Sequence, residues 1–265
     1  MAVVFDSAAS TVGEIWGATT SGTMSVTHTV NPSARSLVVA YVGVMLVTGV
    51  NTTGITLSVS FGGTAMTALS SRTWNSNQET LRVFTLLNPP TGSRTVTVTY
   101  SGLTTELFNR VMMVSSGTWA GIDSTGIGTP VLAGGSSSTS NSVTVSSTLP
   151  AHKVITFHAA GRGFSFSAYN KTKRADVRGP WGTGQLIMGE APGESSVVST
   201  ATQGSTANWG AWGATHAPSI VDGGFSLTTP VSVSETSGST YRTATPAPDR
   251  YWAIPADTRS IEVPS

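Results

Sequence analysis

The stretch NPPTGSRTVTVTYSG occupies residues 88–102, and a similar stretch, GEAPGESSVVSTATQG, occupies residues 189–204. Both place Pro and Gly before a run that alternates β-branched and small polar residues. Alternation of this kind is typical of a strand with one face in a core, and Pro and Gly indicate the turn before it. The chain therefore contains the same turn-and-strand unit twice.

The segments around these two units also follow the same order. SVTHTVNPSARSLVVAYVGV from residue 25 matches SVTVSSTLPAHKVITFHAAG from residue 142, and the strands MMVSSGTWAG and WGAWGATHAP close the two halves. The repeat is too long for a solenoid unit and fits two similar β halves, either facing each other in one sandwich or lying side by side. A general likeness among Thr/Val hairpins is the alternative explanation.

The composition supports an all-β fold. The chain of 265 residues contains 37 Ser and 41 Thr, with 10% charged and 38% hydrophobic residues. Thr- and Val-rich runs favour strands, and the low charge argues against a disordered chain. We expect strands near residues 3–5, 24–30, 37–48, 55–61, 65–70, 80–87, 94–100, 108–119, 142–148, 154–159, 164–168, 185–189, 196–202 and 208–215.

The predicted organisation is one β-sandwich over residues 1–218 and an extended Ser/Thr/Pro-rich arm over residues 219–265. The sandwich divides into halves at about 24–126 and 142–218, and the low-complexity segment AGGSSSTSN at 133–141 predicts a Ser/Gly linker. The fold we expect is an antiparallel, jelly-roll-like (lectin-like) sandwich built from two similar halves.

The longest apolar run, LVVAYVGVMLVTGV at residues 37–50, is too short for a membrane helix. It predicts a central strand that is buried on both faces.

The arm closes with RYWAIPA and RSIEVPS, which share an Arg-x-apolar-x-Ile/Val-Pro pattern. Pro confines such short strands to sheet edges. An arm of this kind could add to the sheet of a partner chain or fold back on its own domain. The predicted assembly residues are Arg250, Trp252, Ile254, Arg259, Ile261 and Val263.

Composition also excludes several classes of site and partner. The chain has no Cys, so disulfides, thiolate metal sites and a Cys nucleophile are excluded. Binding to nucleic-acid phosphates requires a clustered basic surface, and a net charge of +1 does not indicate one, so we expect no nucleic-acid partner. The start, MAVVFDSAAS, lacks the basic region of a signal peptide. We expect a particle assembled in the cytoplasm and released by lysis, with no membrane partner.

The polar residues give no catalytic or metal pattern. The histidines His28, His152, His158 and His216 lack metal-ligand spacing, and no GxSxG motif is present. Asp123, Asp222, Asp249 and Asp257 form no calcium-loop series. Glu190 and Glu194 flank a Pro-Gly turn, where we expect solvated charges. The prediction is a chain that is not an enzyme and uses no cofactor and no metal.

One segment stands out as a candidate contact site. AYNKTKRADVRGPWGTG at residues 168–184 is longer than a hairpin turn needs, and long loops are often functional. It offers stacking and charged groups for a glycan: Tyr169, Lys171, Lys173, Arg174 and Trp181. Packing against a neighbouring subunit is the alternative. Trp209 and Trp212 should point to opposite faces of a strand, one in the core and the other exposed.

Three further segments carry a family resemblance: SFGGTAMTAL at 60–69, LLNPPTGSRTVTVTYSG at 86–102 and TWAGIDSTG at 118–126. With them, the chain resembles minor tail and other virion surface proteins of tailed phages that infect actinobacteria. The resemblance extends over residues 25–218 and the tail, and the second half departs most from the family pattern.

The resemblance implies a jelly-roll or lectin-like sandwich and a non-enzymatic structural role in a phage virion, as a minor tail protein. A capsid decoration protein, a carbohydrate-binding adhesin and a glycan hydrolase are the alternatives. The implied partners are other virion proteins, further copies of the chain in a homo-oligomer, and a host cell-wall glycan.

Overall fold

The computed structural model describes residues 3–15, 19–31, 37–48, 52–103, 110–146, 149–161 and 165–218, with the short pairs 232–233 and 242–243. Regular structure in these residues is strand, apart from one 3-10 turn at Pro180–Gly182. The all-β prediction is therefore confirmed. The described part of the chain contains no helix of the length and apolarity needed to span a bilayer.

Most strands overlap the predicted ones, but β1 extends to residue 15 instead of residue 5, and β13 lies where no strand was predicted. The first half contains β1 (Val4–Ile15), β2 (Gly22–Val30), β3 (Leu37–Val47), β4 (Thr56–Phe61), β5 (Thr64–Ala65), β6 (Thr67–Trp74), β7 (Glu79–Leu87), β8 (Gly92–Ser101) and β9 (Arg110–Ile127). The second half contains β10 (Val131–Ser146), β11 (Lys153–Ala160), β12 (Phe166–Tyr169), β13 (Thr172–Arg178), β14 (Gln185–Pro192) and β15 (Ser196–Pro218).

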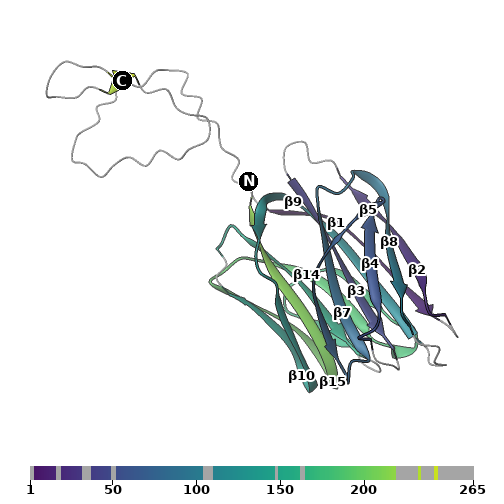
Figure 1. Ribbon diagram of the computed structural model, residues 1–265. Helices are drawn as coiled ribbons and strands as arrows, with labels where there is room; N and C mark the ends of the chain where they lie inside the picture. The colour runs from purple at the N-terminus through teal and green to yellow at the C-terminus, as the bar shows by residue number, and fades with distance from the viewer. Residues whose placement is uncertain are drawn as a thin grey trace. The chain divides into compact units, whose positions relative to one another are not determined.

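The first half forms a sandwich of two antiparallel sheets, one in the order β1-β9-β3-β7-β6 and the other in the order β2-β8-β4-β5 (Figure 1). Strand β8 alternates as its sequence predicts. Val96 and Val98 point into the core between the sheets, and Thr95 and Thr99 are exposed on the outer face.

The second half is organised by two long strands, β10 and β15. They pair with each other at both ends, and the register shifts between Gly135 and Ser140. The later part of β15 continues the sheet β13-β14-β11, whereas its earlier part pairs with β12. Val145 and Val197 of the outer sheet pack against Val154 of β11. The second half is therefore also two-layered.

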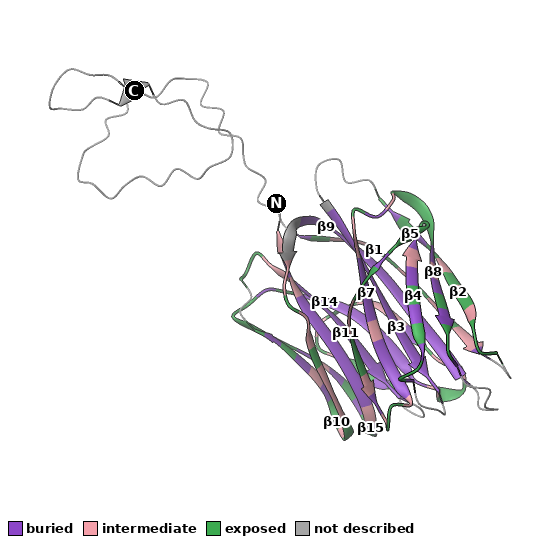
Figure 2. Ribbon diagram, in the orientation of Figure 1, coloured by how far each residue is buried: buried purple, intermediate pink, exposed green. Residues whose placement is uncertain are grey.

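The two sandwiches pack back to back through the β3–β9 and β11–β14 sheets. Along β3, Val39 and Tyr41 face the second half, and Ala40 and Val42 face the core of the first. Figure 2 shows β3, β11 and β14 as largely buried strands in the middle of the stack. The prediction of a strand buried on both faces within residues 37–50 is confirmed for residues 38–48, whose burial the structure describes.

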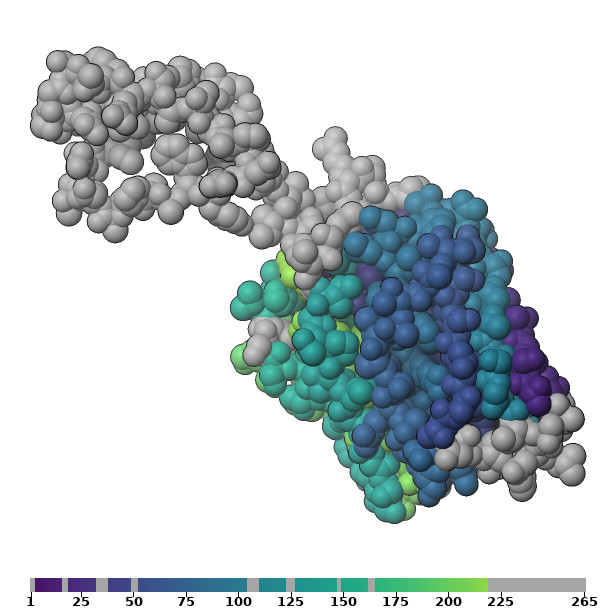
Figure 3. Space-filling model, viewed as in Figure 1, coloured from purple at the N-terminus to yellow at the C-terminus, as the bar shows by residue number. Residues whose placement is uncertain are grey.

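The interface between the sandwiches is close and specific. A Cβ atom placed on Gly43 would lie 2.4 Å from Cδ1 of Phe157, so β3 approaches the Phe157 ring closely only because residue 43 is glycine. Trp212 Nε1 donates to Ser70 Oγ across the interface at 2.8 Å. Figure 3 shows the first half (purple to blue) and the second (teal to green) on separate parts of the visible surface.

Strand pairings of the first half recur in the second. The β1–β9 and β2–β8 pairs correspond to the two parts of the β10–β15 pairing, at residues 131–135 and 140–146. The β3–β7 and β3–β9 pairs correspond to β11–β14 and β11–β15. The β4–β8 and β6–β7 pairs correspond to β12–β15 and β13–β14. The β7–β8 connection, which ends at Gly92, corresponds in this scheme to the β14–β15 connection, which contains Gly193.

The predicted linker at residues 133–141 is wrong, because these residues belong to β10. A Cβ atom on Gly134 would lie 3.0 Å from the Trp209 carbonyl oxygen and 2.5 Å from Arg72 Nε. Glycine is therefore required at residue 134, where β10 passes close to β15 and Arg72. Composition alone does not distinguish this requirement from that of a flexible connector.

Residues 221–265 form a separate unit, in which β16 (Ser232–Val233) pairs with β17 (Arg242–Thr243). The predicted assembly residues of the arm, from Arg250 to Val263, lie outside the described residues. Their role stays a prediction.

Candidate functional site

The outer face of the sheet β2-β8-β4 consists of hydroxyl side chains. Residues alternate between the two faces of a strand, so the partners of the buried Val and Leu residues all point outward. These outward residues are Thr23, Ser25, Thr27 and Thr29 on β2, Ser93, Thr95, Thr97, Thr99 and Ser101 on β8, and Thr56, Ser58 and Ser60 on β4. They form an uncharged hydroxyl face on three adjacent strands.

Cross-strand register sets the spacing of this hydroxyl face. Thr97 lies opposite Ser25 on one side and Ser60 on the other, and Ser25 Oγ and Thr97 Oγ1 are 3.2 Å apart. Neighbouring strands are about 4.8 Å apart, and alternate residues along a strand are about 6.7 Å apart. Each hydroxyl can donate and accept, so the face suits a ligand that itself carries many hydroxyls.

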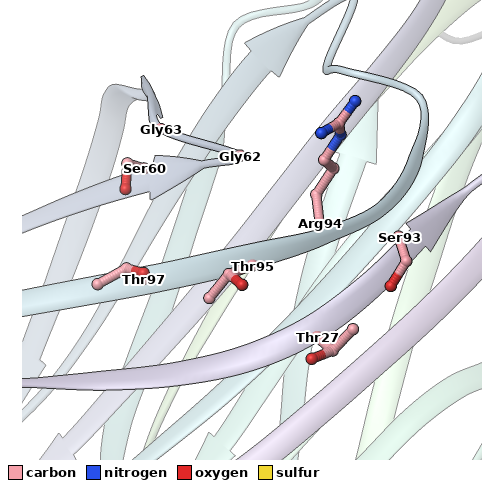
Figure 4. A pocket seen from close by; sticks show the side chains of 8 residues that line it. All are labelled: Thr27, Ser60, Gly62, Gly63, Ser93, Arg94, Thr95 and Thr97. Carbon is pink, nitrogen blue, oxygen red and sulfur yellow. The ribbon is translucent and has the colours of Figure 1, made fainter.

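A shallow depression of about 440 Å³ lies at one end of the hydroxyl face (Figure 4). It is lined by Thr27, Ser60, Gly62, Gly63, Ser93, Arg94, Thr95 and Thr97. The β4–β5 hairpin forms one wall. Gly62 and Gly63 have φ values of 57° and 85°, as a two-residue hairpin turn requires, and they contribute no side chains that would fill the depression.

Arg94 is the charged residue among those that line the depression. Its Nε donates to the Thr91 carbonyl oxygen at 2.9 Å, and Figure 4 shows its side chain extending from β8 away from the side chains of Ser93 and Thr27. This bond uses Nε alone, so the two terminal nitrogens can donate in parallel to a ligand with two adjacent oxygens.

The outer sheet of the second half carries a related face. Its exposed or half-exposed hydroxyl residues are Ser140, Ser142, Thr144 and Ser146 on β10, and Ser196, Thr200 and Thr202 on β15. Ser142 Oγ and Thr200 Oγ1 are 2.7 Å apart. Val198, opposite Thr144, interrupts this face with an exposed apolar side chain.

The predicted contact segment at residues 168–184 is not one irregular loop. Strand β13 occupies Thr172–Arg178, and Pro180–Gly182 is a 3-10 turn. At about 3.3 Å per residue, β13 holds Lys171 and Trp181 at opposite ends, about 20 Å apart. The five predicted residues therefore do not form a common site.

Tyr169 is not available for stacking on a sugar. Its hydroxyl lies 2.7 Å from Thr156 Oγ1, and its ring packs edge-on against His158, at 5.5 Å between ring centroids. Burial raises the pKa of Tyr169, against the opposing effect of its hydrogen bonds to Ser199 and Thr156. The side chain is part of the internal packing of the second half.

The predicted basic residues lie in different surroundings. Lys173 Nζ is paired with Asp176 at 2.6 Å, and Lys171 is half-buried. Arg174 is paired with Glu190 at 2.7 Å and its guanidinium lies 4.2 Å from the centre of the Phe5 ring. These pairs give two of the four basic residues of the segment a carboxylate partner.

Glu190 is buried, so the prediction of a solvated charge is wrong. It points from β14 into the interface between the sandwiches, where Trp119 Nε1 donates to it at 2.5 Å and Lys153 lies 3.3 Å away. Burial alone would raise the pKa of Glu190, but the bonds from Arg174 and Trp119 and the charge of Lys153 outweigh it and lower the pKa. Glu194 is exposed, as predicted.

Trp181 remains an accessible predicted residue, with 88% of its side chain exposed. Its backbone is left-handed, with φ 56° and ψ 24°. The turn is held by Thr183 Oγ1, which donates to the Pro180 carbonyl oxygen at 2.7 Å. A bulky residue held in this strained conformation, with its ring in solvent, is a candidate contact residue.

The second half also contains a Ser–His–Asn arrangement. His158 Nε2 lies 2.8 Å from Ser199 Oγ, and His158 Nδ1 lies 3.0 Å from Asn141 Oδ1. The spacing is that of a nucleophile, base and orienting residue. All three side chains are fully buried, however, and burial lowers the pKa of His158 to about 3. A substrate cannot reach them in this state, so we assign them to core packing.

Two further predictions concern metals and tryptophans. Among the described residues, no group of three His, Asp or Glu side chains could hold a metal ion.

Trp209 and Trp212 point to opposite faces as predicted, but both are buried, because this sheet is covered on both sides. The prediction that one of them is exposed is wrong.

Sequence reasoning missed the hydroxyl face and Arg94. The signal was present in TVTVT at residues 95–99, which places every Thr on one face. Comparison of the chain with protein-family models, with curated proteins and with solved structures found no match.

Proposed function

We propose that this chain is a non-enzymatic structural component of a phage virion, a minor tail protein, which contacts host-surface glycans through the hydroxyl face of its first sandwich. The depression beside Arg94 carries the proposal. It is lined by uncharged hydroxyls from three strands, with the Arg94 guanidinium at its edge.

This combination matches the chemistry of a saccharide. A sugar presents several hydroxyls of mixed donor and acceptor character, which Ser and Thr side chains can satisfy. Arg94 can bind two vicinal hydroxyls or an anionic substituent in a bidentate manner. The open shape of the depression suits one unit within a longer chain rather than an enclosed small molecule.

The fold and sequence support a role in a particle. Two sandwiches that share one buried interface give a large core without any Cys, which suits a protein exposed outside the cell. The recurrent pairing scheme supports two similar halves of jelly-roll type. The resemblance of residues 60–69 and 86–102 to minor tail proteins supplies the virion assignment.

Removal of two hydroxyls tests the glycan contact. The variant Thr95→Val/Thr97→Val keeps the side-chain shape and removes donors and acceptors from the depression, and Thr172→Val makes the same change at an exposed position of β13, which is not part of the hydroxyl face. With about 0.5–1.5 kcal/mol for each of two hydrogen bonds, the double variant should bind isolated cell wall about 5- to 160-fold more weakly. The control should bind like the wild type.

Equal binding by the wild type, the double variant and the control would contradict the proposed contact. The virion role has its own test, because antibody labelling of purified particles should mark the tail. Labelling of the capsid would favour the decoration role, and absence of the chain from particles would contradict both.

A further inference from the structure

Strand β10 lies at a sheet edge, and its two parts differ in how that edge is covered. Among the described residues it pairs only with β15. In the earlier part, Arg72 Nη2 approaches the Gly134 carbonyl oxygen to 3.4 Å, so a neighbouring strand of the same chain caps the edge. The later part, residues 140–146, has no such contact among the described residues.

Two other edges of the molecule, those of β13 and β2, are protected. Strand β13 carries charged residues, including Lys173, Asp176 and Arg178, and a register irregularity. The edge of β2 is covered by β1, where Ser7 Oγ donates to the Thr29 carbonyl oxygen. Charges, bulges and covering segments are the devices by which proteins prevent edge-to-edge pairing. Residues 140–146, SNSVTVS, contain no charge and no Pro.

The same segment is complementary to a second copy of itself. Asn141, Val143 and Val145 point inward, and the residues between them point outward. Two antiparallel copies related by a twofold axis at Val143 pair over the whole of residues 140–146. In this register each inward residue lies opposite an inward residue, so Val145 and Asn141 of the partner extend the core.

We propose that residues 140–146 of β10 form a homodimer interface, in which two copies of the chain pair edge to edge into a continuous antiparallel sheet. The twofold axis is perpendicular to the sheet, because antiparallel neighbours keep the same face outward. Both copies therefore present their first-sandwich hydroxyl faces to the same side. The pairing does not rest on the proposed glycan contact.

Disulfide trapping tests the register. Ser142 lies opposite Thr144 of the other copy, so the variant Ser142→Cys/Thr144→Cys should form two intermolecular disulfides on mild oxidation. Directly opposed residues have Cβ atoms about 4.5–5.5 Å apart, which a disulfide can bridge with small adjustments. The chain has no Cys of its own. Val198→Cys/Thr200→Cys, one strand farther from the edge, is the matched control and should not cross-link.

The mass of the full chain in solution supplies the second readout. Light scattering after size exclusion should give twice 27.2 kDa for the wild type. Ser142→Lys/Thr144→Lys places lysines opposite each other on an exposed face and should give a monomer with an unchanged circular dichroism spectrum. A monomeric wild type, or a dimer that resists the lysines and does not cross-link at 142 and 144, would overturn the proposal.

Discussion

Three buried histidines should make the protein unstable in mild acid. His28 lies in the core of the first sandwich, His158 in the core of the second and His216 between the two. Burial lowers the pKa of His28 to about 4 and that of His158 and of His216 to about 3. An unfolded histidine has a pKa of about 6.5.

These values fix the sign and the window of the effect. Below about pH 6.5 the unfolded chain binds protons that the folded chain does not bind, so the free energy of unfolding falls as the pH falls. Each histidine contributes a slope of about 1.4 kcal/mol per pH unit down to its folded pKa. At pH 5 each costs about 2 kcal/mol, and the three together about 6 kcal/mol, which is comparable with the total stability of many domains.

Urea unfolding, followed by tryptophan fluorescence at pH 7, 6 and 5, measures this slope. The variants His28→Gln, His158→Gln and His216→Gln should each reduce the slope by about a third, whatever they do to stability at pH 7. The slope is the useful readout, because it does not depend on how well each glutamine packs. A wild-type unfolding free energy that changes by less than about 1 kcal/mol between pH 7 and pH 5 would refute the reasoning.

Three further predictions concern stability. Gly43→Val should lower the free energy of unfolding by about 1–3 kcal/mol or more, because its side chain would overlap the Phe157 ring, and Phe157→Ala in the same chain should recover part of that loss in thermal melts. Trp181→Gly should raise stability by about 1 kcal/mol in urea titrations, since glycine accepts the left-handed backbone without strain, whereas Trp181→Ala should not. Glu190→Ala should cost about 3–5 kcal/mol at pH 7, because Arg174 loses its partner at the buried interface, and an equal loss in the exposed control Glu194→Ala would contradict this explanation.

Local sequence predicted most strands because alternation and β-branching act over a few residues. The run at residues 95–99 places Val inward and Thr outward in the sequence and in the fold. The apolar run at 37–48 likewise indicated burial on both faces. Neither run identifies the segments that pack against each face of its strand, so the back-to-back packing of two sandwiches could not be predicted.

The wrong predictions share one physical cause, which is that the neighbours of a residue come from distant segments. Glu190 resembles a turn residue in sequence, but Arg174 and Trp119 meet it in the fold. Strand β13 resembles a loop because its charges protect an edge. The Ser/Gly run of β10 resembles a linker because its serines are largely exposed and Gly134 lies close to Trp209 and Arg72. The composition of a segment gives its residue types, but it does not show which distant residues surround them in the fold.

Burial of β3 on both faces has a consequence for synthesis on the ribosome. Tyr41 and Trp119 of the first half are covered by Phe157 and Trp212, which emerge from the exit tunnel much later. A nascent chain that stops before β11 therefore exposes a broad apolar sheet, which can bind chaperones or aggregate. The first half can bury this sheet only after the second half has been translated. Truncation of either half should therefore prevent both halves from folding stably.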